Sequence, residues 1–162
     1  MANINVSSPS NFVKLYVSTS TIASVTATGV LEVLSLQDIT VNNNNGTFRW
    51  KELGLTSQKV VATPSTNSLG FNIVLDDSTF YGTLGSTGTT TVEKGIFELS
   101  NSKNQLYFRM YWSGATGTSS NYVSGNGYIT GLAPKVNPDQ PVWISPLNIE
   151  VNGDFISGKG IT

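Results

Sequence analysis

Apolar side chains recur at every second position along much of this chain, which is the spacing of a β-strand with one buried face. The clearest example is the stretch from 69 to 75, whose apolar positions on one face are Leu69, Phe71, Ile73 and Leu75. Stretches with the spacing of an amphipathic helix do not recur in this way. The pattern therefore predicts an all-β fold.

Turn residues divide this pattern into eight short predicted strands. They cover residues 12–17, 30–41, 59–62, 69–75, 95–99, 105–112, 127–132 and 142–151. Eight short strands separated by turns are typical of two packed antiparallel sheets in a sandwich or barrel. At most one short helix is expected, at 76–84, where Asp77 or Ser78 would cap the first turn.

The chain has 162 residues, a length that predicts a single domain over 1–162. Asn45-Gly46 and Asn152-Gly153 have the composition of tight turns with positive φ. Asn42 to Asn45 are therefore predicted to form the tip of a long exposed loop at about 38–50. The Gly-, Ser- and Thr-rich segments 82–91 and 113–120 are also predicted loops.

The composition argues against catalysis. The chain contains no histidine and no cysteine, which removes the commonest general base, the commonest zinc ligand and any thiolate. Asp76 and Asp77 are adjacent, so they are predicted to cap a turn or helix and not to face each other across a cleft. No catalytic, cofactor or metal site is predicted, and we do not expect an enzyme.

The charge balance limits the partners. The chain contains nine Lys and Arg and ten Asp and Glu, and only 12% of its residues are charged. It therefore has no excess of basic side chains for a stable complex with nucleic acid. A neutral, polar surface suits a protein that associates with its own copies. No membrane-spanning stretch is predicted. The polar first nine residues do not have the pattern of a secretory signal, so synthesis in a cytoplasm is expected.

The aromatic residues allow two interpretations. They could form a sugar-stacking platform, or they could fill the core or a subunit interface, where Trp and Tyr are enriched. We favour the second interpretation. The residues concerned are Trp50, Trp112, Trp143, Tyr107, Tyr111, Tyr122 and Tyr128.

Two stretches of the sequence resemble a known family. Arg49-Trp50-Lys51-Glu52-Leu53, which follows a polar loop, resembles an aromatic-containing segment after the second strand of some siphophage tail tube proteins. The closing part of the family is similar to 127–132 (Gly-Tyr-Ile-Thr-Gly-Leu), 137–142 (Asn-Pro-Asp-Gln-Pro-Val) and 147–153 (Leu-Asn-Ile-Glu-Val-Asn-Gly).

The resemblance implies two packed β-sheets with a helix, and a structural virion protein that self-assembles. Six copies would form a ring, and stacked rings would form the conduit for DNA ejection in a virion tail, made in the cytoplasm of a host bacterium. The implied partners are copies of the chain, other phage tail proteins and DNA in transient, non-specific passage. The family has a clear helix in mid-chain, for which 76–84 is a poor candidate. Candidates for a loop that reaches the next ring are Asp38, Asn42, Asn43, Asn44, Asn45, Gly46, Arg49 and Trp50.

A conduit must not retain DNA, so its lining should be neutral or acidic. The acidic candidates for the lumen are Glu32, Asp38 and Glu150, on or beside predicted strands. Alternation does not indicate which face meets the channel. Two other functions remain open: a capsid decoration or tail-tip domain that binds another virion protein, and a carbohydrate-binding module.

Overall fold

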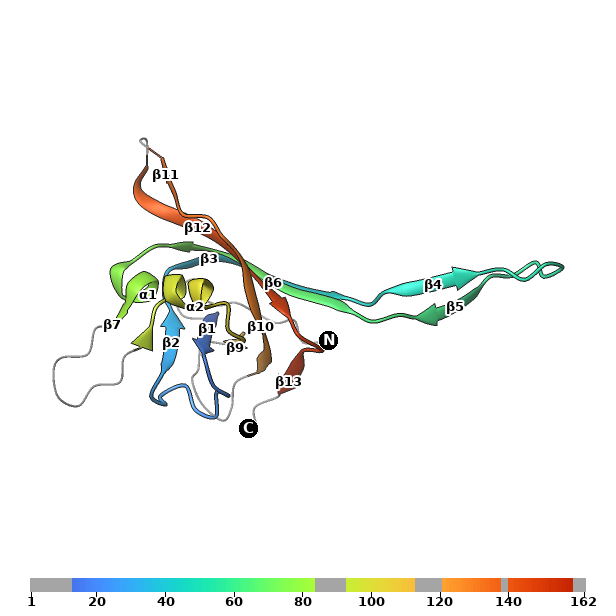
Figure 1. The fold of residues 1–162 in the computed structure, drawn as a ribbon, viewed down its shortest axis with the longest axis horizontal. Helices are drawn as coiled ribbons and strands as arrows, with labels where there is room; N and C mark the ends of the chain where they lie inside the picture. Colours follow the sequence, from blue (N-terminus) through green and yellow to red (C-terminus); the bar gives the residue numbers. More distant parts are fainter. Residues whose placement is uncertain (1–12, 84–92, 113–120, 138–139, 159–162) are drawn as a thin grey trace, which may run out of the picture.

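The computed structural model describes residues 13–83, 93–112, 121–137 and 140–158. Thirteen strands and two short helices lie in these ranges (Figure 1). The strands are β1 (Lys14–Ser18), β2 (Val30–Val33), β3 (Leu36–Asn44), β4 (Thr47–Trp50), β5 (Lys59–Ala62), β6 (Thr66–Val74), β7 (Gly82–Thr83), β8 (Glu93–Lys94), β9 (Leu106–Tyr111), β10 (Tyr122–Leu132), β11 (Lys135–Asn137), β12 (Gln140–Val151) and β13 (Ile156–Gly158). The helices are α1 (Asp77–Tyr81) and α2 (Ile96–Ser102). Neither helix has the length and apolar character needed to cross a membrane.

Nine strands form one antiparallel sheet in the order β2-β1-β9-β10-β12-β6-β3, with β11 paired to β12 and β13 paired to β10. Strand β10 joins the two halves of this sheet, because its first part pairs with β9 and its second part pairs with β12. The two halves pack on one core, to which Leu15 and Phe108 come from one half and Phe71 and Ile149 from the other. The predicted all-β fold with packed antiparallel layers is confirmed, and both layers belong to a continuous sheet.

Gly127 lies where β10 passes from one neighbour to the other. A Cβ atom at this position would lie 2.1 Å from the carbonyl oxygen of Glu150 and 3.0 Å from Cγ2 of Ile149. Because the first of these contacts is with backbone, no side-chain rotation can relieve it. The close approach of β10 and β12 therefore requires glycine.

The strand predicted at 95–99 is wrong, because these residues enter helix α2. Ile96 and Leu99 are buried and three positions apart, whereas Phe97 and Glu98 are exposed. That spacing belongs to one face of a helix, and a five-residue window was too short to distinguish it from alternation. The described part of the chain therefore has two helices where at most one was expected, and α2 is a mid-chain helix of the kind that the family resemblance implies.

The helix predicted at 76–84 is present as α1, but it is shorter and its cap is Asp76, not Asp77 or Ser78. The Oδ1 atom of Asp76 accepts hydrogen bonds from the Thr79 amide at 2.9 Å and from the Ser78 hydroxyl at 2.6 Å. Burial alone would raise the pKa of Asp76, but these hydrogen bonds outweigh it and leave the pKa below its usual value. The adjacent carboxylates thus begin a helix, as their spacing predicted.

The single strand predicted at 30–41 is two strands. Ser35 has a φ of 57°, which turns the chain between β2 and β3. The two strands lie at opposite ends of the main sheet, where they form its edges. This reversal sends the chain from one layer of the core to the other.

The turn predicted at Asn45-Gly46 is wrong. Pairing of β3 with β6 reaches Asn44 and Thr66, and pairing of β4 with β5 then continues from Thr47 and Ala62 to Trp50 and Lys59. Across the junction, the amide of Thr63 donates a hydrogen bond to the carbonyl of Gly46 at 2.8 Å. The chain reverses within residues 51–58. Residues 38–50, predicted as a loop, therefore lie in β3 and β4, the two successive strands that lead outward to this reversal.

Residues 47–62 form a long two-stranded projection that we call the arm. It extends far beyond the rest of the protein (Figure 1). At the other predicted turn, Gly153 has the expected positive φ, 95°, but the strand that follows, β13, pairs with β10 and not with β12, so the tight hairpin predicted there is wrong. Most of the predicted loop 82–91, and all of 113–120, lie outside the described residues.

Candidate functional site

The outer face of β3, β6, β12 and β10 is polar across four neighbouring strands. Strand alternation turns Leu69, Phe71 and Ile73 of β6 into the core and their neighbours outward. The outward positions are Asp38, Thr40, Asn42 and Asn44 on β3, Thr66, Ser68, Gly70 and Asn72 on β6, Pro146, Asn148 and Glu150 on β12, and Tyr128 and Thr130 on β10. No lysine or arginine occurs at these positions. We call this surface the polar face.

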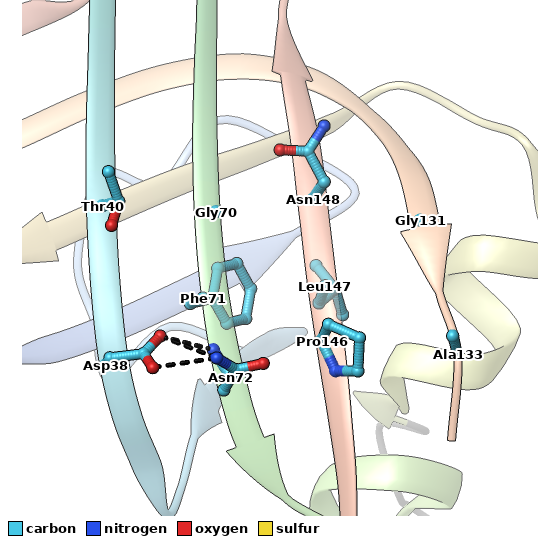
Figure 2. A pocket seen from close by; sticks show the side chains of 10 residues that line it. All are labelled: Asp38, Thr40, Gly70, Phe71, Asn72, Gly131, Ala133, Pro146, Leu147 and Asn148. Carbon is cyan, nitrogen blue, oxygen red and sulfur yellow. Dashed lines mark hydrogen bonds between the residues drawn. The ribbon is translucent and has the colours of Figure 1, made fainter. Parts of the chain in front are cut away.

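Cross-strand hydrogen bonds saturate much of the polar face. The side-chain amide of Asn72 donates to Oδ2 of Asp38 at 2.8 Å, and its backbone amide donates to Oδ1 at 3.2 Å (Figure 2). The side-chain amide of Asn148 donates to Oγ1 of Thr130 at 2.9 Å, although the two residues are 18 positions apart. Groups that are satisfied by one another are hydrophilic but have little capacity left to hold a ligand.

A shallow hollow lies in the centre of the polar face. Asp38 on β3 and Gly131 on β10 stand at its two sides, and Gly70 and Asn148 lie between them (Figure 2). A Cβ atom at Gly131 would meet nothing closer than 3.7 Å, so glycine is not required there by packing. The hollow contains a single carboxylate and no basic group. We assign it no ligand-binding or catalytic role.

The three acidic lumen candidates do not lie together. Asp38 and Glu150 are on the polar face, whereas Glu32 is on β2 at the other edge of the main sheet. Glu32 pairs with Lys14 at 2.9 Å and accepts a hydrogen bond from the Tyr16 hydroxyl at 3.3 Å. The hydrogen bond to Glu32 raises the pKa of Lys14, and burial together with the Glu32 carboxylate raises the pKa of Tyr16.

The arm exposes aromatic and aliphatic side chains. Phe48 stands opposite Val61, and Trp50 stacks on Phe48 with their ring centroids 6.0 Å apart. The exposed fractions of Phe48, Trp50 and Val61 are 57%, 38% and 49%. An isolated two-stranded hairpin is only marginally stable in water, and exposed apolar clusters mark interaction sites. The arm therefore has the character of a surface that is covered in an assembly.

The root of the arm is tied to the turn that follows β12. The side-chain amide of Asn67, which is buried, donates a hydrogen bond to the carbonyl of Gly153 at 2.9 Å. Beside it, the hydroxyl of Ser65 donates to Oδ1 of Asp154 at 3.0 Å. These contacts hold the direction in which the arm leaves the sheet.

The predicted loop residues divide into two groups. The first group lies in β3, within the main sheet, and consists of Asp38, Asn42, Asn43 and Asn44. The second group lies at the junction or on the arm and consists of Asn45, Gly46, Arg49 and Trp50. The sequence-based prediction missed Phe48, Val60 and Val61, although the alternation in Thr47-Phe48-Arg49-Trp50 was available as a signal.

The three tryptophans lie on separate elements. Trp50 is on the arm, Trp112 follows β9 and is half-buried, and Trp143 is on the β11–β12 hairpin, which projects in another direction (Figure 1). Trp50 and Trp143 are exposed, so they do not fill the core, and for these two residues a place in a subunit interface stays a prediction. The structure does not bring the tryptophans together as a sugar-stacking platform.

The described residues offer little for catalysis. No group of three or more Asp and Glu side chains within them could hold a metal ion. Of the tyrosines considered for a platform, Tyr111 packs edge-on against Tyr16 with ring centroids 6.0 Å apart and contacts the tilted ring of Tyr122 at 5.9 Å. The site is therefore a set of surfaces and not a pocket.

No family model and no curated protein sequence matches the chain. Solved structures do match it. The SPP1 tail tube, solved by solid-state NMR and cryo-EM, aligns with 93% of this chain and 78% of its own at a TM-score of 0.64 and 13% identity. The tail of an empty gene transfer agent particle, refined with C6 symmetry, aligns over 92% of this chain and 96% of its own at a TM-score of 0.60 and 10% identity. The chain has the tail tube fold.

A protein of a contractile injection system also has a fold similar to that of this chain. The sheath/tube terminator of an extracellular contractile injection system aligns with 95% of this chain and 99% of its own at a TM-score of 0.57 and 13% identity. The resemblance to tail tube proteins is thus confirmed at the level of the fold.

Proposed function

We propose that this chain is a tail tube subunit, whose copies associate into rings that stack into a conduit for DNA in a virion tail. The observation that carries the proposal is the polar face, a broad strand surface with no basic side chain, on a chain with the tail tube fold. DNA passes a surface of this kind without being retained, because retention requires Lys or Arg to replace the phosphate counterions.

The polar face lines the channel in this proposal. Asp38 and Glu150 then face the lumen, and the Asn, Ser and Thr side chains around them form a neutral lining. Glu32 is not part of this lining, because it lies at the other edge of the sheet in an ion pair with Lys14. The lumen carries a small negative charge from each subunit.

Ring closure would join the sheet edges of neighbouring copies. Within the described residues, β2 and β3 are the two ends of the main sheet, and unpaired edges of this kind invite strand pairing with another chain. A closed ring removes these edges. Six copies per ring is supported by the C6 symmetry of the gene transfer agent tail, which has the same fold.

The arm provides the contact between rings in this proposal. Its apolar side chains are exposed, and it projects well beyond the sheet that would form the ring wall (Figure 1). At the ends of the tube, other tail proteins would cover the same surfaces. The passage of DNA is transient and non-specific.

Negative-stain electron microscopy of the purified full-length chain, combined with analytical ultracentrifugation, tests the proposal. We expect rings or hollow tubes that grow with protein concentration. A protein that stays monomeric at high concentration, or that forms multimers only with a capsid lattice, would contradict a tube subunit. The second result would identify a decoration protein.

A further inference from the structure

The arm and the helices lie at opposite ends of the protein. Strand β6 begins beside the arm at Thr66 and ends at Val74, and α1 follows after two residues. In Figure 1 the arm leaves the body on one side, and α1 and α2 lie toward the other. In a stack of identically oriented copies, the arm of one copy is therefore directed toward the helical end of the next. Such a head-to-tail contact repeats without closing.

The helical end carries an exposed aromatic cluster, which we call the helical patch: Phe80, Tyr81 and Phe97. Phe80 contacts Tyr81 with ring centroids 4.9 Å apart and Phe97 at 5.4 Å. Tyr81 is 67% exposed and Phe97 is 50% exposed. The core side of α2 is already formed by its buried residues, so Phe97 is not needed to hold the helix on the sheet. Among the residues that the structure describes, none covers the exposed parts of Tyr81 and Phe97, which leaves them open to another molecule.

Charge favours this patch as the partner of the arm. The arm contains Arg49, Lys51 and Lys59 against Glu52 alone, and one of its lysines forms an ion pair with Glu52. The rest of the chain then has six basic and nine acidic residues. Residues 76–103, which include the helical patch, contain four acidic and two basic residues. A basic arm and an acidic helical end attract each other.

A second apolar surface lies near the same end. The β11–β12 hairpin exposes Val136, Val142 and Trp143. Ile144, the next residue of β12, lies opposite Val74 at the end of β6, which places the hairpin near this end. Residues 133–146 contain one basic and one acidic residue, so this hairpin has no charge complementary to the arm. It serves as the competing site in the test.

We propose that the apolar side of the arm, formed by Phe48, Trp50 and Val61, docks on the helical patch of a second copy of this chain. The proposal rests on the proposed function and deepens it by naming the receiving surface. The aromatic rings supply the buried area, and the exposed Asp77 carboxylate on α1 attracts the net positive charge of the arm, whereas Glu98 is already paired with Lys94. The contact is heterologous, so each copy both gives an arm and receives one.

The absence of cysteine from the chain makes cross-linking a direct test. One chain carries Ser57→Cys at the end of the arm, and a second carries Asn101→Cys, one helical turn beyond Phe97 on α2. Both positions are exposed, and neither substitution alters the apolar residues of the contact. The chains are mixed, allowed to assemble and treated with a short bismaleimide. A third chain with Lys135→Cys on β11 replaces the second as the matched control.

We expect the Ser57→Cys and Asn101→Cys chains to give several-fold more linked dimer than the Ser57→Cys and Lys135→Cys chains. Equal yields, or a larger yield with the β11 position, overturn the helical patch as the receiving surface. Tubes that form without either linkage also overturn it while the proposed function stands. A chain that forms no tubes removes both proposals.

Charge reversal gives an independent readout. Asp77→Lys should raise the protein concentration needed for assembly several-fold, and combining it with Lys59→Asp, which lies opposite Trp50 on the apolar side of the arm, should restore part of that loss. Circular dichroism of the unassembled variants checks that the fold is intact. A double variant that assembles no better than Asp77→Lys alone would contradict the pairing of these two surfaces.

Discussion

Replacing both aromatic residues of the arm by Phe48→Ser and Trp50→Ser should prevent stacking while leaving the isolated subunit intact. Full burial of a large apolar side chain stabilises by roughly 1.5–3 kcal/mol. Phe48 is 57% exposed and Trp50 is 38% exposed, so about half of that gain is still to be made when the arm docks. The loss is then about 2 kcal/mol per contact, or roughly 30-fold in its equilibrium constant. Because a ring would dock through all its arms at once, these losses add.

The assay is the concentration at which tubes appear, measured by sedimentation and checked by electron microscopy. The melting temperature of the unassembled variant should equal that of the parent, since the arm makes no contact with the apolar core. Ile156→Ser is the matched control, because Ile156 is 63% exposed and lies on β13, away from the arm. Normal tubes from the double variant would refute the role of the arm, and a large drop in melting temperature would refute the claim that it is independent of the core.

Three further predictions concern the sheet, the first helix and the polar face. Gly127→Ala should lower the free energy of unfolding, measured in urea, by about 3 kcal/mol, because the added Cβ would lie 2.1 Å from a backbone oxygen. This value is the upper range for overpacking. The control Gly131→Ala, whose Cβ would have its nearest neighbour at 3.7 Å, should cost far less. Asp76→Ala should cost about 1 kcal/mol at pH 7 through loss of the helix cap. Because folding lowers the pKa of Asp76, its contribution is present above its usual pKa and is lost as the pH falls through the folded value, so urea titrations of parent and variant should converge below about pH 4. Glu150→Lys should make assembled tubes retain DNA in a co-sedimentation assay at low salt, whereas Glu150→Gln should not; equal retention by both would show that this position does not meet DNA.

The strands of the core were predictable from sequence because one face of each strand is buried and the other is more exposed. Leu69, Phe71 and Ile73 face the core while their neighbours face outward, and a period of two records that difference directly. The same holds for 105–112, where tyrosines on the second face pack in a smaller internal cluster. A local pattern is sufficient where burial alternates locally.

The arm shows where that reasoning fails. Asn45-Gly46 has the composition of a tight turn, yet the pairing of Phe48 with Val61 and of Trp50 with Lys59 carries the strands past it. Whether a local turn or a longer hairpin forms depends on the cross-strand partners, which here lie nine and thirteen residues away. Similarly, Ile96 and Leu99 fit a strand or a helix equally well until their neighbours in the core are known.

The candidate site was predictable in type but not in position. Composition predicted a neutral, polar surface, and Asp38 and Glu150 lie on the same polar face. Glu32 is also an acidic residue on a strand, β2. The chain reverses at Ser35 between β2 and β3, so Glu32 lies at the opposite edge of the sheet from β3. Which face a strand residue occupies follows from topology, and alternation alone carries no topology.

A helical cryo-EM reconstruction of tubes assembled from the purified chain tests the central claim most directly. The account predicts a channel wall built from β3, β6, β12 and β10, with Asn42, Asn148 and Glu150 directed into the lumen. A channel lined instead by the outer face of β2, β1 and β9, with Glu32 toward the lumen, would contradict it.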